Sequence, residues 1–150
     1  MSVVKAALIQ MELKADPKTD SFDKIRDCMI DAHMPLIEKA ADQGVQVIGL
    51  QEVWTMPYFP AEIDSRWFGT AEPIPDGPTT QLMMETAKRL NMVIVSPIYE
   101  SGNDGKLYYC SCYRCRWPLS RKISKDTHTK NLGIRRKILF YFWKYRFSSL

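Results

Sequence analysis

The stretch from Val45 to Trp54, V-Q-V-I-G-L-Q-E-V-W, predicts a buried strand that ends at a carboxylate. Its aliphatic and β-branched residues form a short run, and Gly44 separates it from the preceding segment, which favours a central strand over a helix. In open α/β folds, ligands bind beyond the carboxyl ends of such strands, so Glu52 is well placed for catalysis. The structural alternative is a strand-end carboxylate that caps a helix or pairs with an arginine. The pattern alone leaves both readings open.

The residues before this stretch predict a strand and a helix. Val3 to Met11 is apolar for most of its length, which predicts a strand covered on both faces. A helix is expected next, with Asp20 or Ser21 as its N-cap and Gly44 at its end. Its expected apolar face recurs at spacings of three and four and comprises Phe22, Ile25, Met29, Ala32, Leu36 and Ala40.

Pro35 is expected to kink this helix or to restart it, because proline lacks the backbone N–H. Cys28 and His33 lie within the helix, and we interpret both as structural residues. The strand, the helix and the strand at Val45 together predict a right-handed βαβ unit with parallel strands.

The residues after Trp54 predict a pocket wall, a helix and a third strand. Trp54, Tyr58 and Phe59 are candidates for the substrate pocket, since loops after strand ends shape pockets; packing beneath a surface loop is the alternative. A helix from Thr79 or Thr80 to Asn91 is expected to turn Leu82, Met83, Ala87 and Leu90 inward. A third buried strand, 92–97, and a hairpin-type turn, 101–105, follow.

Charge divides the chain into two unlike parts. Residues 1–106 carry 10 Lys and Arg against 16 Asp and Glu, a net of −6, whereas residues 107–150 carry 11 against a single acid, a net of +10. Neither a secretory signal nor an apolar run of about 20 residues is evident, so we expect a cytoplasmic protein with reduced thiols.

Four motifs together resemble the carbon-nitrogen hydrolase (nitrilase) superfamily, and most closely its β-ureidopropionase and N-carbamoyl amidohydrolase branch. They are A-L-I-Q near the start, L-Q-E-V-W-T-M-P-Y-F at 50–59, A-E-P-I-P-D-G-P-T-T at 71–80 and V-I-V-S-P-I-Y-E at 93–100. The resemblance covers residues 1–107 in order, which we take as a partial hydrolase domain; residues 108–150 form a basic tail that we expect to be poorly ordered.

The resemblance implies the N-terminal portion of an αββα sandwich, incomplete in this chain, and a Glu-Lys-Cys mechanism without metal or other cofactor. In that mechanism Glu52 is the general base, a cysteine attacks the amide or carbamoyl carbon, and a lysine stabilises the oxyanion. The implied partners are a small amide or N-carbamoyl substrate and, in the family, further copies of the subunit, which we do not expect for a fragment. Neither nucleic acid nor membrane is an implied partner.

The sequence departs from the family after Leu107. The family continues with a strand and then a lysine-bearing motif, G-K-x-R-K-x-H-I-P, but no alternating strand pattern and no such motif follow here. Displacing the reading frame by one nucleotide from Tyr109 permits T-A-V-V-I-D-A-D-G-P-L-A-G-K-Y-R-K-T-H-I-P-K, which restores the pattern. We therefore infer an out-of-frame tail. Lys122, Lys125 and Lys130 lie outside any such motif, so none is assigned as catalytic.

Two functional readings of the tail are disfavoured by this origin. Cys110, Cys112, Cys115 and His128 are spaced only loosely like a zinc site. Basic residues from Arg135 to Arg146 alternate with aromatic ones, as in a nucleic-acid or membrane patch. The leading hypothesis is therefore a truncated, inactive carbon-nitrogen hydrolase, and the alternative is a basic-tailed protein that binds nucleic acid or anionic membrane.

Overall fold

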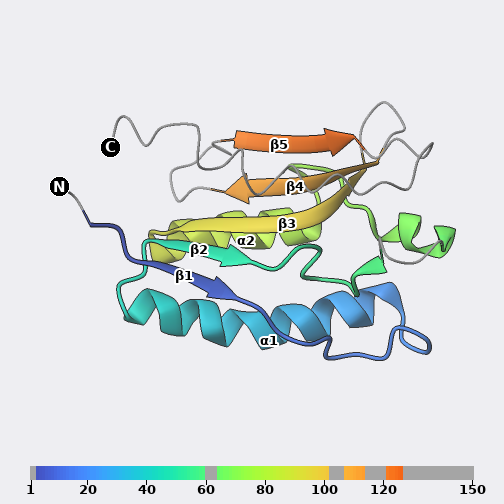
Figure 1. Ribbon diagram of the computed structural model, residues 1–150, viewed down its shortest axis with the longest axis horizontal. Coiled ribbons are helices and arrows are strands. Elements are labelled where there is room, and N and C mark those ends of the chain that lie inside the picture. The colour runs from blue at the N-terminus through green and yellow to red at the C-terminus, as the bar shows by residue number, and fades with distance from the viewer. Residues whose placement is uncertain (1–2, 60–63, 102–106, 114–120, 127–150) are drawn as a thin grey trace.

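A five-stranded sheet organises the part of the chain that the structure describes. The computed structural model describes residues 3–59, 64–101, 107–113 and 121–126. The strands lie side by side in sequence order (Figure 1). Their bounds are Ala6–Ile9 for β1, Val47–Leu50 for β2, Val93–Ser101 for β3, Leu107–Tyr113 for β4 and Arg121–Asp126 for β5.

The first three strands are parallel, and the last two are antiparallel to their neighbours. Register pairs Ala6 with Val47 and Val47 with Val93, so the carboxyl ends of β1, β2 and β3 meet at one edge of the sheet. This confirms the parallel strands of the predicted βαβ unit, while its right-handed crossover stays a prediction. Ser101 pairs with Leu107 in the antiparallel β3–β4 pair, as expected of strands that flank a hairpin. Residues 102–106, where the turn was predicted, lie outside the described residues.

The first helix, α1, spans Phe22–Asp42 and begins at the predicted cap. The Ser21 hydroxyl oxygen accepts a hydrogen bond of 3.3 Å from the backbone N–H of Lys24. The predicted restart at Pro35 is wrong, because one continuous helix runs through it. Pro35 and Asp31 both lie on the exposed side, so the Asp31 carbonyl, which loses its helical donor, can bond to water instead.

The buried face of α1 differs from the predicted one in its second half. Leu36 is 42% exposed, whereas His33 and Ile37 are fully buried. The buried positions recur mostly at intervals of four and comprise Ile25, Met29, His33, Ile37 and Ala40. A histidine therefore occupies a core position that hydrophobicity alone assigned to its neighbours, which agrees with the structural role predicted for it.

The second helix, α2, spans Pro78–Leu90, and its N-cap is Gly77 rather than Thr79 or Thr80. The capping oxygens come from Glu72. Its carboxylate accepts bonds from the Thr79 backbone N–H at 2.9 Å and from the Thr79 hydroxyl at 2.6 Å. The threonine hydroxyl is thus a donor to a remote acid, a long-range contact that local capping rules do not predict.

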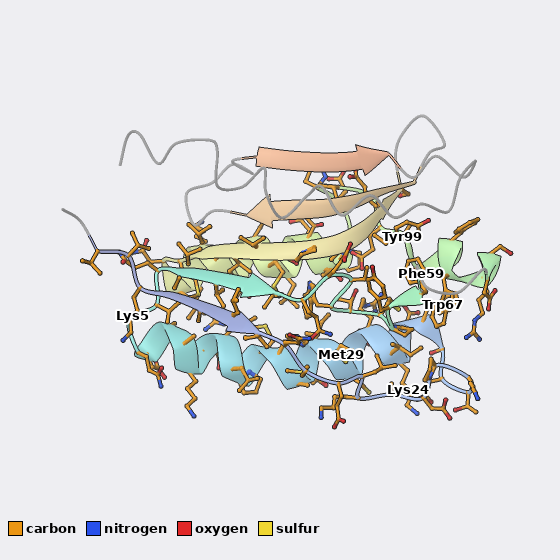
Figure 2. The ribbon with its side chains drawn as sticks, in the orientation of Figure 1. Lys5, Lys24, Met29, Phe59, Trp67 and Tyr99 are labelled. Carbon is orange, nitrogen blue, oxygen red and sulfur yellow. The ribbon has the colours of Figure 1, made fainter. Side chains whose placement is uncertain are left out.

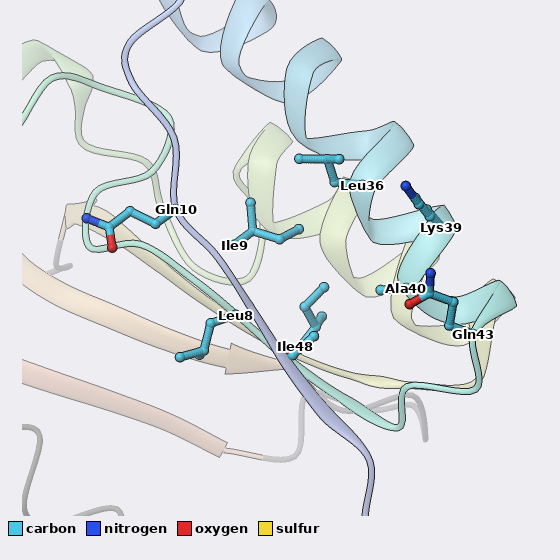
Figure 3. A pocket seen from close by; sticks show the side chains of 9 residues that line it. Leu8, Ile9, Gln10, Leu36, Lys39, Ala40, Gln43 and Ile48 are labelled. Carbon is cyan, nitrogen blue, oxygen red and sulfur yellow. The ribbon is translucent and has the colours of Figure 1, made fainter.

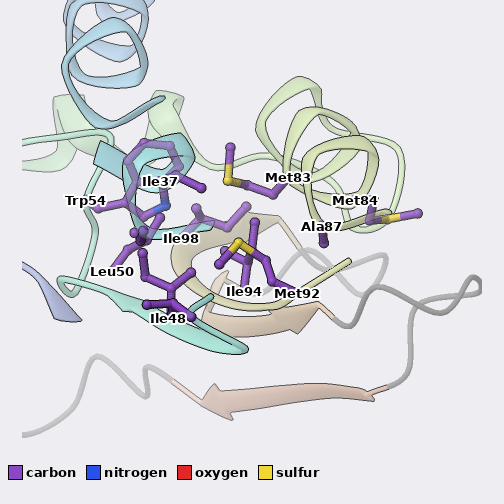
Figure 4. Packing of buried hydrophobic residues seen from close by; sticks show 12 residues of the cluster. Ile37, Ile48, Leu50, Trp54, Met83, Met84, Ala87, Met92, Ile94 and Ile98 are labelled. Carbon is purple, nitrogen blue, oxygen red and sulfur yellow. The ribbon is translucent and has the colours of Figure 1, made fainter. Parts of the chain in front are cut away.

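Both helices cover the same face of the sheet. One cluster of buried side chains contains Ile37 of α1, Met83 and Ala87 of α2, Ile48 of β2 and Ile94 of β3. Figure 4 shows these side chains gathered between the helices and the strands. This confirms Met83 and Ala87 as inward residues. Within the described part of the chain, neither helix is long and apolar enough to span a membrane.

Among the described residues, the opposite face of the sheet is only partly covered, which corrects the prediction for the first strand. β1 lies at the end of the strand order, and Leu8 on this face is 89% exposed. In β2, Ile48 and Leu50 are buried while the alternate residues are half-buried. The first strand is therefore an edge strand covered on one face, and its apolar sequence overstated its burial.

The strand expected to be missing after Leu107 is present, so that prediction is wrong. β4 and β5 occupy 107–113 and 121–126 and extend the sheet beyond β3. Tyrosine-rich sequences pair readily as strands even without apolar alternation, and the edge of β3 supplies backbone partners. Residues 127–150 lie outside the described residues.

We expect Gly77→Ala to destabilise the protein by roughly 1–3 kcal/mol through overpacking. A Cβ atom there would lie 2.6 Å from the Pro73 carbonyl oxygen and 2.8 Å from the Glu72 carboxylate. Glycine-to-alanine changes at ordinary backbone angles usually stabilise by about 0.4–1 kcal/mol, so the sign is diagnostic. Urea denaturation checks it, with exposed Asp76→Ala as the control; unchanged or increased stability of Gly77→Ala would contradict the close approach.

Candidate active site

Glu52 lies two residues beyond the end of β2, on a tight turn at the edge where the parallel strands end. Its side chain is exposed, while the four residues that follow it, 53–56, are all buried. A turn that buries its other side chains and exposes one carboxylate presents that carboxylate to solvent in a defined place. This is the placement that the sequence predicted for a strand-end acid.

The backbone of this turn is anchored on both sides of Glu52. The side-chain oxygen of Gln51 accepts a hydrogen bond of 2.7 Å from the backbone N–H of Met11, which follows β1. Val53 has φ +51°, a left-handed conformation that is unusual for a β-branched residue, and its side chain is 1% exposed. Such strain, on the order of 1–3 kcal/mol, persists where surrounding packing enforces it, and it clusters at functional sites.

Trp54 connects the turn to two other elements. Its indole N–H donates a hydrogen bond of 2.8 Å to the Ser96 hydroxyl on β3. The His33 ring of α1 lies edge-on to the indole, with ring centroids 4.7 Å apart and planes at 64°. All three side chains are fully buried. The turn that carries Glu52 is therefore held against both the sheet and the helix layer.

His33 is neutral in this environment. Its Nδ1 lies 2.7 Å from the Met29 carbonyl oxygen, which can only accept, so Nδ1 carries the proton. Its Nε2 is buried without a hydrogen-bond partner among the described residues. Burial lowers the pKa of His33, and the hydrogen bond to Met29 opposes this only in part.

An aromatic cluster lies beside the Glu52 turn. Phe59 stacks on Trp67 with ring centroids 5.9 Å apart, and Tyr99 of β3 meets Phe59 edge-on at 5.0 Å. Figure 2 shows Phe59, Trp67 and Tyr99 gathered at one end of the molecule. Trp67 belongs to a short 3-10 helix, Ser65–Thr70. Burial raises the pKa of the Tyr99 hydroxyl to about 12, so this group is a neutral phenol at physiological pH.

The residues predicted to line a substrate pocket occupy unlike environments. Trp54 is fully buried and Phe59 is 5% exposed, whereas Tyr58 is 49% exposed. Tyr58 can therefore meet a ligand directly, while Trp54 and Phe59 support the turn and its loop. The pocket role of all three stays a prediction. Ser96 had no sequence signal as a partner of the turn, since 42 residues separate it from Trp54.

The tail residues with predicted roles are not tested by this geometry. His128, Lys130 and the basic-aromatic run from Arg135 lie outside the described residues. The expectations that the tail holds neither a zinc site nor the catalytic lysine, and that the hydrolase-like part ends at residue 107, therefore stay predictions. Within the described part of the chain, no group of three metal-ligating side chains occurs.

The fold and this site define an α/β protein that carries an exposed carboxylate at the ends of parallel strands. The family model described as carbon-nitrogen hydrolase matches residues 5–138. The chain is 42% identical over 102 residues to beta-ureidopropionase of Arabidopsis thaliana, covering 68% of this chain and 24% of that protein. It is 31% identical over 109 residues to omega-amidase of Bos taurus, covering 72% and 34%.

Solved structures show the same fold. A carbon-nitrogen hydrolase from Helicobacter pylori matches with a TM-score of 0.65 at 16% identity, over 81% of this chain and 39% of that chain. Nit3 of Saccharomyces cerevisiae, a nitrilase superfamily member, matches with a TM-score of 0.57 at 18% identity, over 81% and 44%.

The chain belongs to the carbon-nitrogen hydrolase family. It spans only about a quarter to a third of the length of the curated relatives it matches. The family match also extends to residue 138, beyond the 107 residues over which the sequence motifs were recognised. The recognition of the family and of its fold from the first 107 residues is confirmed.

We expect Ser96→Ala to destabilise the protein by about 1–3 kcal/mol, because it leaves the Trp54 N–H buried and unpaired. In a double-mutant cycle with Trp54→Phe, the coupling free energy should be about 1 kcal/mol. Urea denaturation of the four proteins measures it, and exposed Ser65→Ala is the matched control. A coupling energy of zero would contradict the bond.

The free energy of unfolding should decrease as the pH is lowered, over a range that His33 sets. Because the pKa of His33 is lower in the folded state, the unfolded state binds more protons as the pH drops below about 6.5. The unfolding free energy is therefore highest above that pH and decreases, by up to about 1.4 kcal/mol per pH unit, until the folded pKa is passed.

Unfolding free energies from pH 7.5 to 5 test this expectation. His33→Gln should remove most of the decline, whereas His128→Gln, which changes the chain's other histidine, should retain it. If the unfolding free energy loses its pH dependence in His128→Gln and keeps it in His33→Gln, the assignment to His33 is contradicted.

Proposed function

We propose that this chain is the N-terminal, base-carrying segment of an amidohydrolase of the β-ureidopropionase type, and that Glu52 is its general base. The substrate class is N-carbamoyl amino acids or related small amides. In the complete mechanism the Glu52 carboxylate accepts the proton of a cysteine thiol, and the thiolate attacks the carbamoyl or amide carbon. The C–N bond then breaks, and the nitrogen takes that proton from Glu52 and leaves as the amine, so the acyl group stays on the cysteine as a thioester. Glu52 then activates the water that releases the acyl group.

The exposed carboxylate of Glu52 on a buried, anchored turn carries this proposal. A general base must reach the group that it deprotonates while its backbone stays fixed. The 2.7 Å bond of Gln51 and the 2.8 Å bond of Trp54 fix the chain on both sides of Glu52. A carboxylate with a purely structural role would be expected to cap a helix or pair with an arginine, and Glu72 fills the capping role in this fold.

The particular substrate class rests on similarity to known proteins. At 42% identity over 102 residues, the likeness to a beta-ureidopropionase is greater than the 31% likeness to an omega-amidase. The segment compared holds the base but neither a recognisable nucleophilic cysteine nor the lysine motif. We therefore propose that the chain by itself has no hydrolase activity.

We also propose that residues from Tyr109 onward are read out of frame. The displaced frame restores a family-like strand and the motif G-K-Y-R-K-T-H-I-P, which contains the lysine that this chain lacks. The same displacement, continued from Arg135, permits E-E-K-F-Y-F-I-F-G-N-T-G-F-P-V. One displacement of the reading frame permits the family pattern over two separate stretches, which supports a single gain or loss of a nucleotide.

The purified chain should not hydrolyse N-carbamoyl-β-alanine. A gene with one nucleotide inserted or removed near the Tyr109 codon should encode a longer protein that does. In that protein, Glu52→Gln should lower kcat by roughly 10²–10⁴-fold, because proton transfer loses its base. Glu85→Gln, which changes an exposed glutamate of α2, is the matched control and should retain activity.

Three outcomes would overturn different parts of the proposal. Turnover by the chain as it stands, abolished by Glu52→Gln, would contradict the proposed inactivity while supporting the base. A restored protein that is active with both variants would contradict the role of Glu52. A coding sequence that offers no family-like displaced frame would contradict the origin of the tail.

A further inference from the structure

His33 links α1 to the turn that carries Glu52. Its imidazole lies edge-on to the Trp54 indole, with ring centroids 4.7 Å apart. Val53 alone separates Trp54 from Glu52 in the chain, and its side chain is 1% exposed. Because Val53 is packed on the turn, a shift of the indole also displaces the backbone that carries the Glu52 carboxylate.

The imidazole ring of His33 is held in one orientation. Its Nδ1 donates to the Met29 carbonyl oxygen, one helical turn earlier, at 2.7 Å. This bond fixes the plane of the ring, which meets the indole plane at 64°. Edge-to-face contacts between aromatic rings are favourable and depend on orientation. The Trp54 indole is therefore constrained by the His33 ring on one side and, at 2.8 Å, by the bond of its N–H to Ser96 on the other.

An apolar side chain could fill the position of His33 without burying an unpaired polar atom. His33 is fully buried, and the neighbouring buried positions of the same helix face hold Met29 and Ile37. Its Nε2 has no hydrogen-bond partner among the described residues. A buried polar atom without a partner destabilises the folded state, so its presence in a native protein calls for an explanation. The orientation of the Trp54 indole provides an explanation that stability does not.

The packing at His33 is close, unlike the packing further along α1. Near the end of the helix, a groove of about 270 Å³ lies between α1 and β1 (Figure 3). The helix lines it with Leu36, Lys39 and Ala40, and His33 is not among its lining residues. Side chains beside a groove can shift without moving their neighbours, whereas a ring in close contact with another transmits a displacement.

We propose that His33 is a positioning residue for the general base: it orients the Trp54 indole, and the indole fixes the turn that presents Glu52. This role rests on the proposed function of Glu52. A general base must stay within hydrogen-bond reach of the group that it deprotonates, and a misplacement of about 1 Å can lower the rate by about 10²-fold. His33 itself meets no substrate, because it is fully buried.

Amide hydrogen exchange in the full chain, followed by NMR, tests the effect of His33 on the turn. The Met56 N–H donates to the Val53 carbonyl at 2.9 Å, so its exchange rate reports opening of the turn. The Val93 N–H donates to the Gln46 carbonyl at 2.9 Å near the amino ends of β2 and β3, and it reports the rest of the sheet. His33→Leu should accelerate exchange at Met56 by at least about tenfold and leave that at Val93 unchanged.

Thr86→Val is the matched control for this experiment. It also replaces a buried polar side chain of a helix with an apolar one, near the end of α2 that leads into β3, and it should leave exchange at Met56 unchanged. Far-UV circular dichroism verifies the fold of each variant, and His33→Met is the second replacement should His33→Leu not fold. Equal acceleration at Met56 and Val93, or none at Met56, would overturn the proposal.

Kinetics of the longer protein from the restored reading frame separate this role from the proposed function. His33→Leu should lower kcat by about 10–100-fold and change KM by less than about twofold, because the base is displaced while substrate-binding groups are not. Thr86→Val should retain both values. If Glu52→Gln loses activity while His33→Leu retains kcat, the positioning role is overturned and the base stands. Retained activity in Glu52→Gln would instead overturn the proposed function, and this role with it.

Discussion

The buried indole of Trp54 is the contact on which the site depends. It joins the turn after β2 to β3 through Ser96 and to α1 through His33, so three elements distant in sequence meet at one side chain. Because the hydrogen bond is sequestered from water, leaving either partner unmet would cost more than the bond contributes. The position of Glu52 is therefore a consequence of core packing two residues further along the chain.

The one-sided core is the second constraint. The helices bury one face of the sheet, and on the other face the Leu8 side chain of β1 is exposed. Gly49, opposite Leu8, has no side chain, and a Cβ there would lie 2.9 Å from Leu8 Cδ2. The absence of a side chain at Gly49 thus makes room for the Leu8 side chain on the exposed face of the sheet.

Local patterns in the sequence predicted the order of the strands and main helices as far as β3 and the place of Glu52 just beyond β2, because short-range periodicity indicates where a strand ends; they did not predict β4 or β5. Ser21 as a cap and Met83 as a core residue follow from spacing alone. The cap of α2 and the partner of Trp54 do not, since they come from residues 7 and 42 positions away. The exposure of Leu8 also escaped prediction, because hydrophobicity cannot indicate whether a second layer is present.

The pairing of β4 with β3 shows why a departing sequence can still continue a sheet. A strand pairs with a sheet edge through its backbone N–H and C=O groups, and every residue except proline supplies both. The run L-Y-Y-C-S-C-Y has no proline and is rich in tyrosine, and this composition favours a strand whatever reading frame encodes it. A strand at 107–113 therefore does not require the family's own sequence there. A strand requires only backbone partners and β propensity, whereas a catalytic lysine requires one side chain at one position.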